Sequence, residues 1–209
     1  MKDIVLEIGK VRKLPSFVQH LSRNKTELDR FFGIKLPVPQ VFLIQSRYQI
    51  DKIWKRKTES GNVGWAKGGA IYILSPENYV RESDRKNMST YWKVLKHEHA
   101  HIYQSYVAGG WLPRWLSEGL ACWLAGQTKN KPDLQIALSV IQYHVQGGAG
   151  VYQAGYYWVE RLIGKFGKKK LVAFLRALGP EASQHRVRRV FKNIYGVNWT
   201  KASLKKLYS

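Results

Sequence analysis

The chain has 209 residues, of which 35 are lysine or arginine, 14 are aspartate or glutamate and 6 are histidine, so its formal net charge is +21 at pH 7. With 44% hydrophobic residues it can bury a core, which excludes global disorder. The lone cysteine, Cys122, excludes an intramolecular disulfide framework, and no apolar run reaches the roughly 18–20 residues of a membrane span.

The N-terminal sequence MKDIVLEIGKVRKLPSF lacks the apolar stretch and the small-residue cleavage site of a signal peptide. We therefore expect a soluble, cytoplasmic protein. Three elements are expected next, in this order: a short helix at 24–33, a strand at 41–44 and a polar helix at 46–57. Residues 60–76 then favour a hairpin with strands at 63–66 and 70–74, because β-branched and aromatic residues follow a Gly68-Gly69 turn.

From Ser89 the hydrophobic pattern becomes helical. Side chains of one stripe recur every three or four residues, at Trp92, Leu95, His99, Ile102 and Tyr106. Ser89 is a suitable N-cap and Gly109-Gly110 a suitable stop, so we expect a long helix at 89–108. A second, buried helix is expected from Pro113 (WLSEGLACWLAG), because it is apolar almost all round.

Further helices are predicted at 133–147, 151–166, 168–178 and 181–195. The sequence thus predicts one α+β domain over 1–209, with an N-terminal α/β lobe at 1–88, a joining helix at 89–108 and a helical C-terminal lobe at 109–209. The last part of that lobe is a basic tail, in which residues 161–209 carry 13 Lys and Arg against the single acid Glu181, a local net charge of +12.

The basic tail allows two interpretations. It can bind nucleic acid, anionic lipid or another acidic polymer. Alternatively, it is a solvated basic face that only aids solubility. No zinc-finger motif or RNA-binding aromatic signature accompanies the charge to decide between them.

Residues 97–101 (HEHAH) match the pattern H-E-x-x-H inside the predicted helix. His97 and His101 lie about 40° apart on one helical face, so their imidazoles can bind one metal ion together. Glu98 flanks that face, where it can reach a metal-bound water without ligating the metal. The alternative is that His97 and His101 are merely polar residues on a helix surface.

A catalytic zinc ion needs a third protein ligand and an open fourth position. Glu118 lies 17 residues after His101 in an otherwise apolar helix, where a carboxylate needs a partner. A zinc ion held by the two histidines would be such a partner. A salt bridge to an arginine or lysine is the alternative.

At these residues the chain resembles the gluzincin metallopeptidases, the clan of thermolysin-like and aminopeptidase-N-like enzymes, and is most similar to their small peptidase-MA-like branch. In that branch H-E-x-x-H is followed by P-x-W-L-x-E-G-x-A, which residues 113–121 (PRWLSEGLA) match in full. The resemblance implies a zincin-like fold, with His97, His101 and Glu118 as Zn2+ ligands and Glu98 as general base.

The resemblance extends to a Y-x-x-G segment, which in aminopeptidase-N-like enzymes opens an apolar helix and carries a transition-state tyrosine. Residues 152–155 (YQAG) match it. The match implies that the Tyr152 hydroxyl donates a hydrogen bond to the oxyanion of the tetrahedral intermediate. Tyr156, one helical turn later, is the alternative for that role, and both tyrosines can instead be residues at the edge of the core with satisfied hydroxyls.

Gluzincins also present an edge strand whose backbone pairs with the extended substrate. Residues 68–75 (GGAIYILS) stand in the matching order before H-E-x-x-H, so we expect them to form that edge strand. The aminopeptidase signature G-x-M-E-N contains an acid that captures the substrate's free amine. Residues 68–72 (GGAIY) lack this acid, which favours an endopeptidase.

Three other residues can carry chemistry but favour structural roles. His99 is about 200° around the helix from His97, in the apolar stripe, and is expected to be a core histidine. His144 can be a second oxyanion donor or a buried structural histidine. Cys122, one turn after Glu118 in an apolar helix, is expected to be a small buried hydrophobe.

The sequence therefore predicts a zinc-dependent metallopeptidase that cleaves a peptide or protein substrate by Glu98-assisted attack of a zinc-bound water. The rival hypothesis is a basic nucleic-acid- or polyanion-binding protein with a non-catalytic zinc site. A combined hypothesis has the peptidase dock on an acidic partner through residues 161–209. Glu98 favours a peptidase, because a structural zinc site has no use for a non-ligating acid beside the metal.

Overall fold

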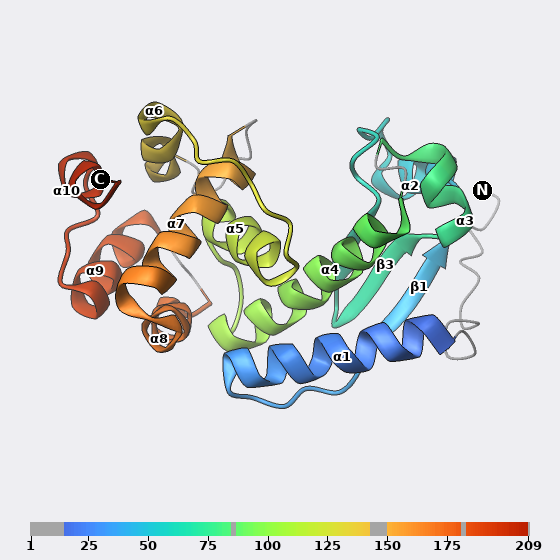
Figure 1. Ribbon diagram of the computed structural model, residues 1–209, viewed down its shortest axis with the longest axis horizontal. Helices are drawn as coiled ribbons and strands as arrows, with labels where there is room; N and C mark the ends of the chain where they lie inside the picture. Colours follow the sequence, from blue (N-terminus) through green and yellow to red (C-terminus); the bar gives the residue numbers. More distant parts are fainter. Residues whose placement is uncertain (1–14, 85–86, 143–149, 181–182, 209) are drawn as a thin grey trace. The chain divides into compact units, whose positions relative to one another are not determined.

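The computed structural model describes residues 15–84, 87–142, 150–180 and 183–208. The chain divides into two compact units, Met1–Ile102 and Tyr103–Ser209, and the division falls inside helix α4 (Met88–Ala108). A small mixed sheet lies in the first unit, and the described part of the second unit contains only helices, so the architecture is α+β (Figure 1). No helix in the described ranges is long and apolar enough to cross a membrane.

The described part of the first unit runs in the order α1 (Pro15–Phe32), β1 (Gln40–Ile44), α2 (Arg47–Trp54), β2 (Gly64–Lys67), β3 (Ala70–Leu74), α3 (Pro76–Glu82) and the first part of α4. Local chemistry sets several of these boundaries. The Ser46 hydroxyl caps α2 by accepting a hydrogen bond from the Gln49 N–H. Gly68 and Gly69, with φ of 60° and 77°, form the two-residue turn between β2 and β3, a conformation that L side chains resist.

The three strands have the order β1-β3-β2. β1 pairs in parallel with β3, and β2 pairs antiparallel with it. Because β3 is hydrogen-bonded on both sides, the expectation that residues 68–75 form an edge strand is wrong: the hairpin exists, but β1 covers its second strand. The edge on the hairpin side is β2.

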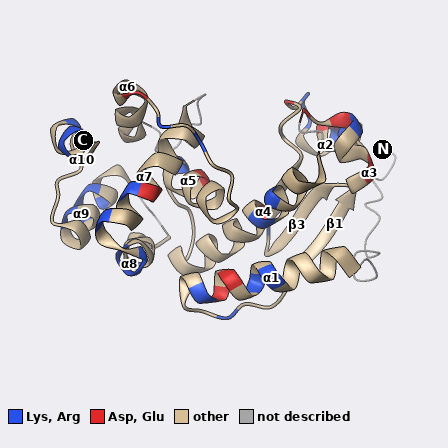
Figure 2. Ribbon diagram, viewed as in Figure 1, with Lys and Arg blue, Asp and Glu red and all other residues tan. Residues whose placement is uncertain are grey.

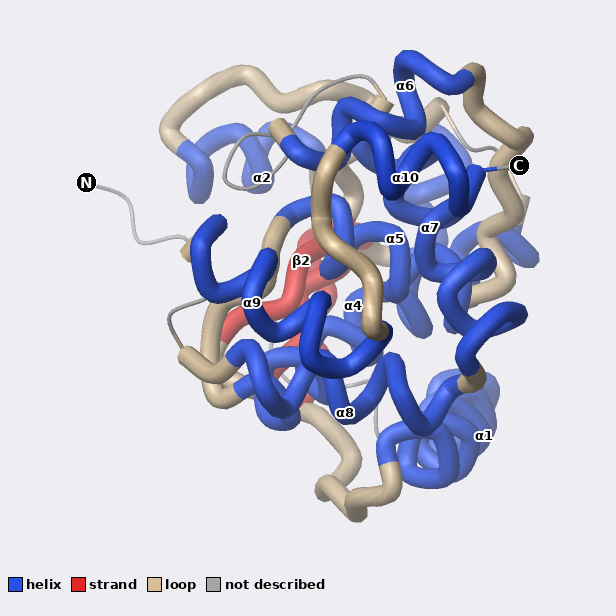
Figure 3. Tube along the Cα trace, turned by 90° about the vertical axis from the view of Figure 1, so that its left-hand side faces the viewer, coloured by secondary structure: helices blue, strands red, loops and turns tan. Residues whose placement is uncertain are grey.

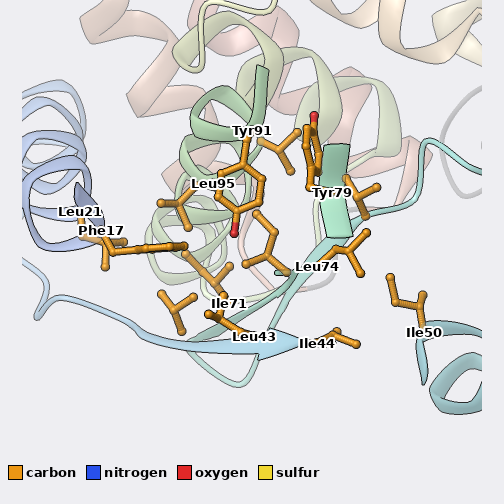
Figure 4. Close-up of a cluster of buried hydrophobic side chains, with 14 residues drawn as sticks. Phe17, Leu21, Leu43, Ile44, Ile50, Ile71, Leu74, Tyr79, Tyr91 and Leu95 are labelled. Atoms are coloured by element: carbon orange, nitrogen blue, oxygen red, sulfur yellow. The ribbon is translucent and has the colours of Figure 1, made fainter. Parts of the chain in front are cut away.

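One continuous apolar cluster joins the sheet to α1 and α4. Ile71 and Ile73 of β3 are fully buried, and they share one face of the strand because side chains alternate. Figure 4 shows side chains of α1, α3 and α4 gathered with those of the strands, among them Phe17, Tyr79, Tyr91 and Leu95. This cluster anchors the N-terminal half of α4 to the sheet.

In the second unit the remaining helices are α5 (Arg114–Leu124), α6 (Leu134–Leu138), the 3-10 turn η2 (Ser139–Ile141), α7 (Val151–Phe166), α8 (Lys168–Leu178), α9 (Gln184–Tyr195) and α10 (Lys201–Tyr208) (Figure 3). α5 and α7 cross through two glycines. A Cβ on Gly119 would lie 2.2 Å from the carbonyl carbon of Gly155, and a Cβ on Gly155 would lie 2.1 Å from the Trp115 carbonyl oxygen. Only glycine fits at either position.

The last three helices are joined by aromatic packing. Phe174 of α8 contacts Phe191 of α9 edge to face, with ring centroids 5.7 Å apart. Trp199, which precedes α10, stacks on Trp115 of α5 at 5.0 Å. The Tyr157 hydroxyl of α7 donates a hydrogen bond of 2.9 Å to the carbonyl oxygen of Tyr208 at the end of α10.

The expected helices at 151–166 and 168–178 are confirmed to the residue, and the long helix begins at Met88, one residue early. The helix expected at 46–57 ends at Trp54, because Lys55 adopts a left-handed conformation with φ of 52°. The helix expected at 24–33 is only the second half of α1.

The helix expected at 133–147 ends at Leu138 and continues as a 3-10 turn to Ile141, and residues 143–147 lie outside the described ranges. The helix expected at 181–195 begins at Gln184, where the Ser183 hydroxyl provides the N-cap. Two short helices, α3 and α10, were not expected from the sequence.

Candidate metal centre

Helix α4 brings two imidazoles to one point. His97 and His101 stand one turn apart, and their Nε2 atoms are 3.1 Å from each other. The two rings are nearly perpendicular, with an interplanar angle of 81°. The two Nε2 atoms therefore point to one position from successive turns of the helix.

Helix α5 supplies the third group. One ligand atom from each of His97, His101 and Glu118 lies within 4.8 Å of the other two, an arrangement that can hold a metal ion. The Glu118 residue is only 7% exposed. The buried cluster expected from the spacing of H-E-x-x-H and the later glutamate is thus present in the structure.

The turn of α4 that follows His101 is fastened to α5 by two hydrogen bonds. The Gln104 side-chain amide donates to the Ser117 carbonyl oxygen at 3.0 Å, and the Ser117 hydroxyl donates to the Gln104 Oε1 at 2.9 Å. Gln104 is 2% exposed. Because Ser117 directly precedes Glu118, this pair fixes the start of α5 next to the helix that carries the histidines.

Glu118 also has the salt bridge that the sequence left open as an alternative. The guanidinium of Arg114, one turn earlier on α5, lies 3.2 Å from the Glu118 Oε1. The two interpretations are compatible, because a carboxylate has two oxygens and several lone pairs. Arg114 was not identified from the sequence, although its position four residues before Glu118 is the spacing of a helical ion pair.

Glu98, the residue after the first histidine, is buried, with 8% of its surface exposed. It lies beside the edge strand β2: a Cβ added to Gly64 would be 3.6 Å from the Glu98 Cγ. The Glu98 side chain and the β2 backbone are thus near neighbours.

Tyr152 stands on the first turn of α7, three residues before the glycine of the crossing. The residue is 38% exposed overall, but burial around its hydroxyl, followed by the negative charge of Glu118, raises the pKa of Tyr152 to about 12. The positive charge of Arg114 opposes this rise in the pKa of Tyr152. The hydroxyl is thus neutral at physiological pH and lies near Glu118.

Tyr156 has other partners. Its hydroxyl donates a hydrogen bond of 3.2 Å to the Glu160 carboxylate on the next turn of α7. Burial, followed by the neighbouring Glu160, raises the pKa of Tyr156. Of the two tyrosines named from the sequence, Tyr152 is the one close to the metal-binding group.

The remaining candidates take structural positions. His99 is fully buried, and burial lowers its pKa to about 4, as expected for a core histidine. Cys122 is also buried, and its thiol donates to the Gln127 side-chain oxygen at 3.4 Å. His144 lies outside the described residues.

Comparison with known proteins adds no relative. No protein-family model, no curated protein and no solved structure matches the chain. The function is therefore inferred from the residues of the site itself.

Proposed function

We propose that this protein is a zinc-dependent metallopeptidase of the gluzincin type that hydrolyses internal peptide bonds. One observation carries the proposal: His97, His101 and Glu118 converge within 4.8 Å, and the non-ligating carboxylate of Glu98 follows the first histidine. A site that only stabilises the fold has no need of that fourth residue.

The donor set suits zinc. Two imidazole nitrogens and one carboxylate oxygen are a ligand set of catalytic zinc sites. Two nitrogens at zinc-binding distance in a tetrahedral arrangement are about 3.3 Å apart, close to the 3.1 Å between the histidine Nε2 atoms. A zinc ion held there would supply a Lewis acid that polarises the scissile carbonyl and lowers the pKa of a water.

Glu98 is proposed as the general base. Its carboxylate accepts a proton from the attacking water and then delivers that proton to the leaving amine. Its position supports this role, because it directly follows His97 in the H-E-x-x-H pattern and its side chain is buried.

Tyr152 is proposed as the oxyanion donor. A phenol with a pKa near 12 keeps its proton at neutral pH and can donate it in a hydrogen bond to the developing negative charge. The positive charge of Arg114, which also pairs with Glu118, lowers the pKa of the phenol and so favours donation of its O–H.

The edge strand β2 is proposed to pair with the extended substrate. Its inner side bonds to β3, and no other described strand pairs with its outer side. Main-chain pairing of this kind tolerates many sequences, which suits a peptidase acting within a chain. This assigns to β2 the function that the sequence had attributed to residues 68–75.

The substitution Glu98→Gln tests the proposal, with Glu59→Gln, an exposed residue of the same unit, as the matched control. Glu98→Gln should bind one zinc per chain by elemental analysis and lose at least about a hundredfold in turnover of a quenched-peptide library. Glu59→Gln should keep both. Parental turnover by the Glu98 variant contradicts the base assignment, and absence of zinc from the parent contradicts the whole proposal.

A further inference from the structure

A surface without acids covers the last three helices of the second unit. α8, α9 and α10 follow one another along one side of this unit (Figure 1 and Figure 3). Figure 2 shows blue stretches and no red on them, since none of the three helices contains Asp or Glu. We call their exposed cations the basic face: Lys168, Lys169, Lys170, Arg176, Arg188, Arg189, Lys192, Lys201, Lys205 and Lys206.

The packing of α9 forces its charges outward. Its apolar side chains, such as Val187 and Phe191, are buried, and Phe191 contacts α8. Arg188, Arg189 and Lys192 follow at spacings of one, three and four residues and therefore lie within one stripe on the opposite side. Because the apolar face of α9 is packed against the core, the helix cannot rotate, and these three cations stay exposed to solvent.

Not every cation in the region belongs to this face. Arg186 turns back to the preceding helix, where its Nε and Nη2 donate to the Ala177 carbonyl oxygen at 3.3 and 3.1 Å. Arg186 thus provides a hydrogen-bond partner for a backbone carbonyl in the last turn of α8 and has a structural role. Arg188, Arg189 and Lys192 form no such hydrogen bond or ion pair with the residues that the structure describes.

In the first unit, cations of helix α1 are paired with acidic side chains. On α1, Arg23 pairs with Glu27 at 3.0 Å, and Lys25 forms an ion pair with Asp29. Acids of the same helix thus offset the positive charge. α8, α9 and α10 contain no acid that could offset their charge in this way, and the like charges of Arg188, Arg189 and Lys192 repel one another unless an outside anion neutralises them.

The chemistry around the basic face selects the anion. No residue of α8, α9 or α10 is among the exposed large hydrophobic side chains of the described chain. A helix that lies in a membrane interface needs such side chains to enter the lipid, and a protein that binds single strands needs exposed aromatic rings for base stacking. Neither feature is present on these helices. The anion that suits the basic face is therefore the row of phosphate groups on a regular nucleic-acid backbone.

We propose that the basic face binds the phosphate backbone of double-stranded nucleic acid without sequence preference. The cations displace counterions condensed on the duplex, so the affinity depends steeply on salt. This activity is independent of the metal centre and goes beyond the proposed peptidase function.

Binding of the full-length protein to two unrelated 20-base-pair DNA duplexes, followed by fluorescence anisotropy from 50 to 200 mM salt, tests the proposal. The two duplexes should bind equally. The triple variant Arg188→Ser, Arg189→Ser, Lys192→Ser should reduce the slope of log affinity against log salt by about 0.9 for each lost phosphate contact and weaken binding at least about tenfold. Its fold is checked by circular dichroism and its zinc content by elemental analysis.

The matched control removes three exposed cations of the first unit, with Lys52→Ser, Arg56→Ser and Lys57→Ser, and changes the net charge equally. It should leave the salt slope near the parental value. Equal loss in both variants overturns the proposal, because net charge alone then explains binding. Failure of the parent to bind at 50 mM salt, or binding to phosphatidylserine vesicles but not to the duplexes, also overturns it.

Discussion

Gly119 of α5 and Gly155 of α7 meet backbone to backbone, and a Cβ on Gly119 would lie within 2.3 Å of both the carbonyl carbon and the oxygen of Gly155. Each glycine stands beside a residue of the site. Glu118 directly precedes the first, and Tyr152 stands almost one turn before the second. The close crossing is therefore what brings the carboxylate and the phenol of two separate sequence motifs together.

The substitution Gly119→Ala should separate these two helices and lower the free energy of unfolding by more than about 3 kcal/mol, the upper end for overpacking, because both obstacles are backbone atoms. Denaturant unfolding measures the change. Gly164→Ala on α7, the other helix of the crossing, is the control, since an added Cβ there meets nothing within 4 Å. It should raise the stability by about 0.5–1 kcal/mol. A Gly119→Ala variant as stable as the parent would refute the described crossing.

The substitution Tyr152→Phe should lower kcat by about 10²–10³-fold with little change in KM, because only the hydrogen bond to the transition state is lost. Zinc content should stay at one per chain. Tyr156→Phe removes only the hydrogen bond to Glu160 and should retain nearly full kcat. If the two effects are reversed, Tyr156 is the donor and the assignment of Tyr152 is wrong.

Removal of metal should lower the thermal stability of the protein. A ligand present at 100 times its Kd stabilises the folded state by about 2.7 kcal/mol, so the melting temperature should fall on chelation and recover when zinc is added back. His101→Ala should abolish this zinc-dependent shift, whereas His185→Ala, on an exposed position of α9, should preserve it. If the zinc-dependent shift in melting temperature persists in His101→Ala, the zinc binds at a site other than the cluster of His97, His101 and Glu118.

The pairing of the two histidines was predictable because its geometry is local. His97 and His101 occupy one helical face wherever the helix lies, and the burial of Glu118 follows from its apolar neighbours. The interpretation of Glu118 as metal ligand or salt-bridge partner could not be decided from sequence. In the structure Arg114 pairs with one oxygen while the carboxylate also approaches the histidines.

Long-range pairing was the part that sequence did not reveal. β1 and β3 pair in parallel although α2 and β2 lie between them, and hydrophobicity alone cannot choose a strand's neighbour. The first half of α1 was missed although Phe17, Leu21 and Leu28 follow a helical period that a longer window would have found. The Gly119–Gly155 contact could not be predicted either, because the two residues are far apart along the chain and nothing in the sequence indicates that they meet in space.

Cys122, buried one turn after Glu118 on α5, is the chain's single thiol. Reagents that alkylate sulfhydryls reach it only when its surroundings open, so the modification rate of the native protein reports local unfolding of α5 without any introduced label. The Cys122 thiol is thus an intrinsic probe of how often the surroundings of α5, the helix with the third candidate ligand, open to solvent.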